Sequence, residues 1–203
     1  MAVLGKALII SLDCVNAALL DQWTANGRLP NLAALRRRGA SGRVTSKSVS
    51  IEADWHTFHT GHQPSEHGHC SYDEIIPGTY RSRMTTAPRS LHPPFWRTLS
   101  QNGARILALN PAHAEPDPDT NGIVITDWLV HDAGHYKAPA SSPPEFVREL
   151  LVRFPGDPVN PNDWGHSTVA DPERLFAAKC ETLRRKMELA VDLLQSRPWD
   201  VCY

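Results

Sequence analysis

Apolar runs of strand length alternate with amphipathic segments of helical length along this chain. The apolar run 6–12 is followed at once by Asp13, a pattern typical of a buried, central parallel strand with a functional group at its carboxyl end. Further strands are expected at 41–46, 104–109 and 123–126, and another begins at Trp199. The predicted helices cover residues 16–25, 30–38, 54–60, 94–102, 145–154 and 171–196. This alternation predicts a doubly wound, mostly parallel sheet.

Two other stretches differ from this pattern. Residues 62–93 are rich in Pro, Gly, Ser and His, and we expect them to form a loop excursion over a site. Residues 138–144 are expected to be a linker. In the last predicted helix the apolar positions recur with helical period, as a stripe normally facing a core does: Phe176, Cys180, Leu183, Met187, Ala190 and Leu194.

The chain ends on residues 197–203, which resemble the opening of a buried strand. Such a strand would lack one flanking layer if nothing followed it. We therefore expect residues 1–203 to be the N-terminal part of one larger α/β domain.

Composition narrows the function classes. A net charge of −1 gives no electrostatic argument for binding a nucleic-acid polymer or an anionic membrane. The arginine run 36–38 precedes Gly39 at a predicted helix end, where cations complement the helix dipole. Residues 7–12 are too short for a signal peptide or a membrane span. The 4 cysteines show no Cys-x-x-Cys spacing, so the reducing cytoplasm is the expected compartment.

Two polar positions are candidates for chemistry. Asp13, at the end of a strand, is placed to hold a divalent cation, or alternatively to cap the next turn together with Asn16. Ser50 lies among Ser48, Glu52 and Asp54, just before a predicted helix N-terminus, with Asp54 as the expected N-cap. A serine hydroxyl near a metal-bound acid is a candidate nucleophile for phosphoryl transfer. The alternative is that these residues only cap the helix.

Histidines are dense between residues 55 and 69. His56 and His59 are three residues apart on one helical face, and His67 and His69 flank Gly68. Zinc accepts imidazole ligands, whereas solvated loop histidines are the alternative. No His-Glu-x-x-His motif is present.

Several short motifs follow one another along nearly the whole chain. They are the strand before Asp13, Leu29-Pro30-Asn31-Leu32 with Gly39-Ala40, Trp55, Thr60-Gly61, Pro64, His67-Gly68, Pro94-Phe95-Trp96 with Gly103, and Trp199-Asp200. In this order they resemble the type I phosphodiesterase/nucleotide pyrophosphatase family of the alkaline phosphatase superfamily. The resemblance implies a three-layer α/β/α sandwich with a mostly parallel sheet.

The resemblance also implies a chemistry: hydrolysis of phosphodiester or pyrophosphate bonds in a small phosphorylated substrate, with two divalent metal ions, usually zinc. In this family a Thr or Ser nucleophile forms a covalent phospho-enzyme intermediate. The family's first-strand Asp ligates metal, and Asp13 matches it. The nucleophile stands four residues before the position of Trp55, which here is Ile51. Ser50, one step away, is the expected nucleophile and second metal-binding residue if the loop holds one extra residue; the alternative is that the site has lost its nucleophile. The Thr-Gly and His-Gly segments are scaffold in the family, so His67 is not assigned as a ligand.

The other family ligands follow the last strand, so we expect residues 1–203 alone to be inactive. The rival hypothesis is a non-catalytic scaffold that binds metal or a partner through the histidine-rich loop. A sulfatase is disfavoured because no cysteine has the required Cys-x-Pro-x-Arg setting. Phosphoglycerate mutase and phosphonate hydrolase relatives stay open, as do the identity of the substrate and the oligomeric state.

Overall fold

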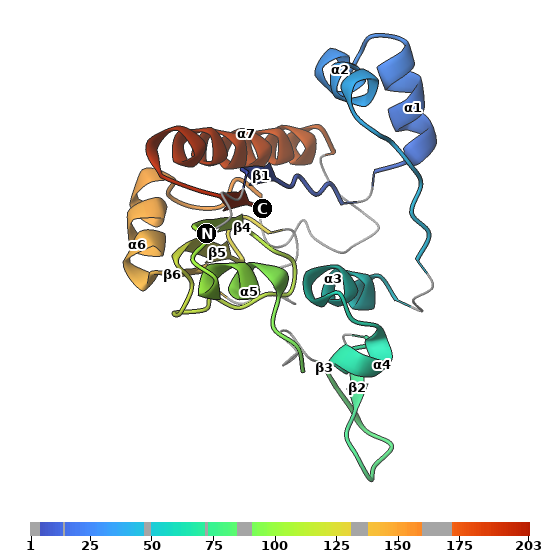
Figure 1. The fold of residues 1–203 in the computed structure, drawn as a ribbon, viewed down its shortest axis with the longest axis vertical. Coiled ribbons are helices and arrows are strands. Elements are labelled where there is room, and N and C mark those ends of the chain that lie inside the picture. The colour runs from blue at the N-terminus through green and yellow to red at the C-terminus, as the bar shows by residue number, and fades with distance from the viewer. Residues whose placement is uncertain are drawn as a thin grey trace. The chain divides into compact units, whose positions relative to one another are not determined.

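The computed structural model describes residues 5–13, 15–46, 50–71, 73–84, 91–130, 138–159 and 172–203. By their contacts the residues divide into two compact units, one formed by residues 10–47 and the other by residues 1–9 and 48–203. Figure 1 shows the order of the elements along the chain.

The larger unit is built on a mixed sheet whose strand order is β1-β7-β4-β5-β6. Its strands are β1 (Ala7–Leu8), β4 (Ile106–Leu109), β5 (Gly122–Thr126), β6 (Ala140–Ser142) and β7 (Val201–Cys202). The first four in spatial order run parallel, and β6 pairs antiparallel with β5. Four of these strands agree with the sequence prediction, whereas β6 lies in the segment expected to be a linker.

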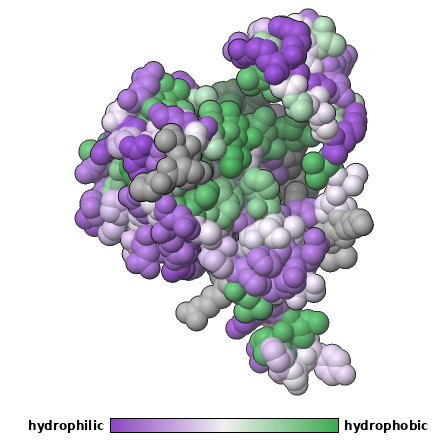
Figure 2. All heavy atoms as spheres, viewed as in Figure 1, coloured by the Kyte–Doolittle hydropathy of each residue, from purple (hydrophilic) through white to green (hydrophobic). Residues whose placement is uncertain are grey.

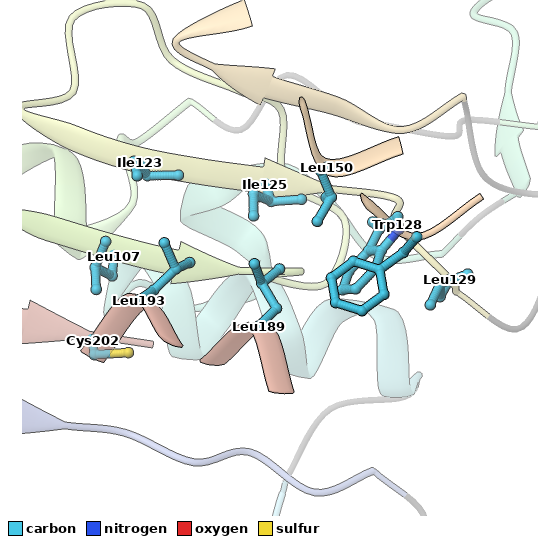
Figure 3. Close-up of a cluster of buried hydrophobic side chains, with 10 residues drawn as sticks. Leu107, Ile123, Ile125, Trp128, Leu129, Leu150, Leu189, Leu193 and Cys202 are labelled. Carbon is cyan, nitrogen blue, oxygen red and sulfur yellow. The ribbon is translucent and has the colours of Figure 1, made fainter. Parts of the chain in front are cut away.

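Side chains of the parallel strands alternate between two hydrophobic cores, as the two-residue period of a strand requires. On one face, Leu107, Ile123 and Ile125 pack against Leu189 and Leu193 (Figure 3). That face is covered by α6 (Pro144–Arg153) and α7 (Pro172–Ser196).

The opposite face of the sheet carries the second core. There Ile106, Ala108, Val124 and Val201 pack with Trp96 of α5 (Phe95–Gln101). The helices on the two faces and the sheet between them make the predicted three-layer α/β/α sandwich, with α6 and α7 as one outer layer and α5 in the other (Figure 1). The fold prediction is confirmed.

Helix α7 buries a different face from the one that its apolar stripe predicts. Leu189 and Leu193 are buried, whereas Phe176, Leu183 and Met187 are 70%, 60% and 55% exposed. Apolar side chains do reach the surface of the molecule among polar ones, as Figure 2 shows. The stripe lies beside the row of α7 that meets the sheet, so Leu194 packs against that core whereas Phe176, Leu183 and Met187 stay exposed.

Strand β1 also differs from expectation. The apolar run 6–12 predicts a central strand buried on both faces, but β1 has only two residues and lies at the edge of the sheet that the described residues form. Leu8 is 51% exposed. The apolar run pairs with β7 alone here, because no described strand lies on its other side.

The stretch predicted to be a loop excursion, 62–93, contains regular structure. It forms α4 (Pro64–His67) and a hairpin of β2 (Asp73–Ile75) and β3 (Ser82–Met84). A capping box between Gln63 and Glu66 starts α4, and Gly68, with φ 79°, ends it. A short polar strand pair in a Pro- and Gly-rich segment gives little apolar periodicity, which is why sequence reasoning missed it. Its position over a site stays a prediction.

The smaller unit holds the helix pair α1 (Ala17–Ala25) and α2 (Pro30–Arg38), both close to their predicted bounds. Asn16 caps α1 by accepting from the backbone N–H groups of Ala18 and Leu19. Arg36 and Arg43 both pair with Asp21, at 2.9 and 3.0 Å. Residues 41–46 do not form the expected strand, because no strand is available in this unit for them to pair with among the described residues.

None of the described helices combines the length and the apolar character that crossing a membrane requires.

Candidate active site

Ser50 is the N-cap of α3 (Ile51–Thr60). Its backbone is extended, with φ −147° and ψ 148°, and its hydroxyl oxygen accepts a hydrogen bond from the backbone N–H of Ala53 at 3.3 Å. Serine is among the preferred residues at this position, because its oxygen satisfies one of the free N–H groups of the first turn. The prediction that Asp54 caps the helix is wrong, since Asp54 lies inside α3.

The Ser50 hydroxyl also donates to the backbone carbonyl of Cys70. Cys70 follows α4 by three residues, so this bond ties the turn after α4 to the first residue before α3. Ser50 therefore has a fixed side-chain orientation: its proton points at the Cys70 carbonyl and its oxygen accepts from Ala53.

The environment of Ser50 has a mixed electrostatic character. The first N–H groups of an α-helix and its macrodipole favour an anion at the N-terminus. Glu52 and Asp54 in the first turn of α3 already supply negative charge there. The helix N-terminus would attract an anionic substrate at Ser50, whereas the two carboxylates would repel it. A bound cation would therefore be needed to offset the carboxylates.

Asp13 follows β1 by five residues and is exposed. It belongs to the smaller unit, whereas Ser50 belongs to the larger one. Both side chains offer oxygen donors, which suit Zn²⁺ and Mg²⁺. Among the described residues, no group of three or more His, Cys, Asp or Glu is arranged to hold a metal ion. The assignments of Asp13 and Ser50 as metal ligands, and of Ser50 as nucleophile, stay predictions.

Four histidines on α3 and after it are buried: His56, His59, His67 and His69 are at most 4% exposed. The alternative of solvated loop histidines is therefore wrong for His67 and His69. His56 packs edge-on against His69, with ring centroids 4.4 Å apart, and both nitrogens of His69 lack a hydrogen-bond partner among the described residues. This buried histidine cluster joins α3 to the turn after α4.

His59 connects the cluster to the sheet. Its Nε2 lies 3.0 Å from the hydroxyl of Tyr203, and its ring packs edge-on against Trp96, with centroids 4.8 Å apart. Burial lowers the pKa of His59 to about 3, with a further contribution from His113. Burial also lowers the pKa of His56 to about 3, reinforced by the neighbouring histidines. Both imidazoles are neutral near pH 7.

Two contacts of this site had no signal in the sequence. A backbone carbonyl such as that of Cys70 can accept from Ser50 whatever residue carries it, so no residue type marks it. The Tyr203–His59 contact joins residues 144 positions apart, which only the fold brings together. The serine at the start of an acidic first turn was the one local clue to the cap.

The model of the type I phosphodiesterase/nucleotide pyrophosphatase family matches residues 7–190. No curated protein matches the sequence.

Among solved structures, the chain is similar to phosphonoacetate hydrolase from Sinorhizobium meliloti. The complex of that enzyme with phosphonoformate has a TM-score of 0.58 and 20% identity, covering 98% of this chain and 45% of that chain. The complex with phosphonoacetate has a TM-score of 0.57 and 19% identity, with the same coverage. The chain thus spans less than half the length of that hydrolase, whose fold it shares. With the family match over most of its length, the chain belongs to the type I phosphodiesterase/nucleotide pyrophosphatase family.

Proposed function

We propose that this protein hydrolyses phosphodiester or pyrophosphate bonds of a small phosphorylated substrate, in a reaction that depends on two divalent metal ions, with zinc as the expected ion. The family match supports the class of reaction. The observation on which the proposal depends is Ser50, a hydroxyl held in one orientation at the N-terminus of a ten-residue helix. This is a setting in which a phosphoryl group can meet free backbone N–H groups.

In the proposed reaction the Ser50 oxygen attacks phosphorus, and the bond between phosphorus and the leaving oxygen breaks. The Ser50 proton, which the Cys70 carbonyl accepts in the free protein, passes to solvent. Water then hydrolyses the phosphoserine and restores the hydroxyl. As the proton leaves, the Ser50 hydroxyl gives up its hydrogen bond to the Cys70 carbonyl, and the oxygen that this bond had oriented forms the bond to phosphorus.

Asp13 and Ser50 would hold metal through oxygen atoms. A bound divalent ion lowers the pKa of a coordinated hydroxyl and offsets phosphoryl charge. It would also offset Glu52 and Asp54 in the first turn of α3.

The test measures hydrolysis of bis(4-nitrophenyl) phosphate by the full-length polypeptide, with and without a chelator. We expect chelator-sensitive turnover that is lost in Ser50→Ala and in Asp13→Ala. Ser71→Ala is the matched control for the first, because Ser71 also accepts a backbone N–H, from Asp73. Asp21→Ala is the control for the second, because Asp21 is an ion-paired aspartate of the same unit.

Acid-quenched protein incubated with substrate should carry phosphate on Ser50, detected by peptide mass spectrometry. Full turnover in Ser50→Ala would refute the nucleophile, and full turnover in Asp13→Ala would refute the metal role. Absence of turnover with every phosphoester in a panel, together with tight zinc binding, would favour the rival hypothesis of a non-catalytic scaffold.

A second candidate is cleavage of the carbon–phosphorus bond of a phosphonate, motivated by the shared fold with phosphonoacetate hydrolase. The same panel with phosphonoacetate separates the two. Release of phosphate from phosphonoacetate, without turnover of the diester, would favour the second candidate.

A further inference from the structure

His67 is the fully buried member of the histidine cluster, at 0% exposure. Its Nδ1 accepts a hydrogen bond from the backbone N–H of His69 at 3.2 Å, and its Nε2 lies 3.1 Å from the hydroxyl oxygen of Thr57. Because a backbone N–H can only donate, Nδ1 must be the bare nitrogen. The neutral ring therefore carries its proton on Nε2 and donates it to Thr57.

A short series of bonds leads from this ring to Ser50. The His69 N–H bond to His67 shapes the turn that follows α4. The next residue in that turn, Cys70, presents the carbonyl that accepts the Ser50 hydroxyl. Ser50 in turn accepts from Ala53 on the same helix. The orientation of Ser50 thus depends on a turn whose first bond requires an unprotonated Nδ1.

Burial favours the neutral ring. Desolvation lowers the pKa of His67, opposed by the Ala53 backbone carbonyl, which stabilises the protonated form. The ionisable and ring groups that face the cluster from the surrounding elements are Glu66, His62, His92, His56, His113, Glu74, Glu52 and Tyr203. Of these groups, His62 and His92 further lower the pKa of His67, and Glu66 raises it. The pKa of His67 is therefore lower than that of an ordinary histidine.

We propose that His67 is a positioning residue for Ser50 and that it holds Ser50 in place only while its imidazole is neutral. The proposal rests on the proposed function for its catalytic meaning. When Nδ1 gains a proton, two N–H donors face each other, the His69 bond is lost, and the Cys70 carbonyl is released from its position. Ser50 then loses the acceptor of its hydroxyl. Hydrolytic activity would then fall as the pH is lowered, because His67 becomes protonated although it never contacts the substrate.

The chain offers a matched set of variants. In His67→Asn the side-chain oxygen can accept from the backbone N–H two residues on, as in an Asx-turn, and it cannot titrate. In His67→Gln a longer amide can still reach Thr57, but the Asx-turn acceptor is lost. Thr57→Val removes the contact between Nε2 and the Thr57 hydroxyl and leaves Nδ1 unchanged.

The experiment follows amide exchange protection of His69 and Ala53 by NMR, from about pH 7.5 to about pH 4, a range that extends well below the ordinary histidine pKa because burial lowers the pKa of His67. In the wild type, both amides should lose protection together as the pH falls, by about tenfold for a lost hydrogen bond. In His67→Asn, protection should stay high across the range. In His67→Gln, it should be low at every pH, and Thr57→Val should follow the wild type.

Several outcomes would overturn the proposal. One is unchanged Ala53 protection in His67→Gln, and another is a Thr57→Val variant that behaves like His67→Gln. If His67→Gln does not fold, wild type and His67→Asn still decide the matter, because identical pH profiles in those two would exclude control by His67. The pH profile of kcat should shift to lower pH in His67→Asn. If no variant hydrolyses any phosphoester while the amide results hold, the proposed function fails and the positioning of Ser50 by His67 stands.

Discussion

Leu193 and Leu183 are two leucines of the same helix with opposite surroundings, and truncating each to alanine tests how α7 packs. Leu193 is 2% exposed and lies in the core with Leu107 and Ile125, whereas Leu183 is 60% exposed. Leu→Ala removes three carbons, worth about 0.8 kcal/mol each when buried. The cavity left behind adds to this, so we expect Leu193→Ala to lower the free energy of unfolding by about 3 kcal/mol.

Leu183→Ala removes the same atoms from a site already in water, and we expect a change within about 0.5 kcal/mol. The assay is urea unfolding followed by tryptophan fluorescence, with the slope on denaturant concentration compared between variants. Equal effects of the two substitutions would refute the described packing of α7. A large effect of Leu183→Ala alone would mean that its face is covered in solution.

Three further predictions concern the sheet, the cap and the histidines. Gly122→Ala should lower the melting temperature far more than Gly103→Ala. Both glycines have positive φ, but a Cβ at 122 would lie 1.9 Å from the Ile106 carbonyl oxygen, whereas a Cβ at 103 meets nothing within 4 Å. Similar melting temperatures of the two variants would contradict this prediction. Ser50→Ala should cost about 1 kcal/mol of unfolding free energy, and Ser50→Asp should restore it, because both Ser and Asp cap helices; equal losses in the two variants would exclude a capping role. Stability should be fully present above pH 6.5 and fall toward pH 3, because the unfolded chain binds protons in this range that His56 and His59 do not bind when folded. Each of the two histidines changes the free energy of unfolding by at most about 1.4 kcal/mol per pH unit. The check is chemical unfolding at several pH values, and a free energy of unfolding that does not change with pH would refute the buried neutral state.

The sequence predicted the sheet well where the signal was local. Residues 104–109 form a mostly apolar run and residues 123–126 are all β-branched, each run lies between turn residues, and they form β4 and β5. The bounds of α2 followed from Pro30 and Gly39. Such signals depend only on a few neighbouring residues, so they can be interpreted without knowledge of the tertiary structure.

The sequence predictions were wrong where the secondary structure or the buried face of a segment depends on the element that it pairs with or packs against. Residues 140–142 carry no strand pattern, yet they pair with β5 because that edge is available. Residues 41–46 carry one but pair with no described strand. The face of α7 was misjudged because Phe176 and Met187 have the same apolar character as Leu189, and only the position of the sheet distinguishes them.

For the candidate site, the sequence indicated Asp13 and Ser50 and the density of histidine. It did not reveal that His67 and His69 are buried or that Ser50 bonds to Cys70. A histidine in a Gly- and Pro-rich segment looks the same whether water or aromatic rings surround it. Only the packing against α3, where His56 and Thr57 contact these histidines, determines which applies.

The two cores on opposite faces of the sheet have a consequence for how the molecule opens. Because β4 and β5 place alternate side chains in both cores, neither core can melt without the other, and we expect them to exchange their amide hydrogens as one foldon. Helices α1 and α2 contain no buried residue, so residues 10–47 should open at much lower free energy. Asp13 thus lies in the part of the chain expected to open first, and metal bound through it would appear as protection of that segment from exchange.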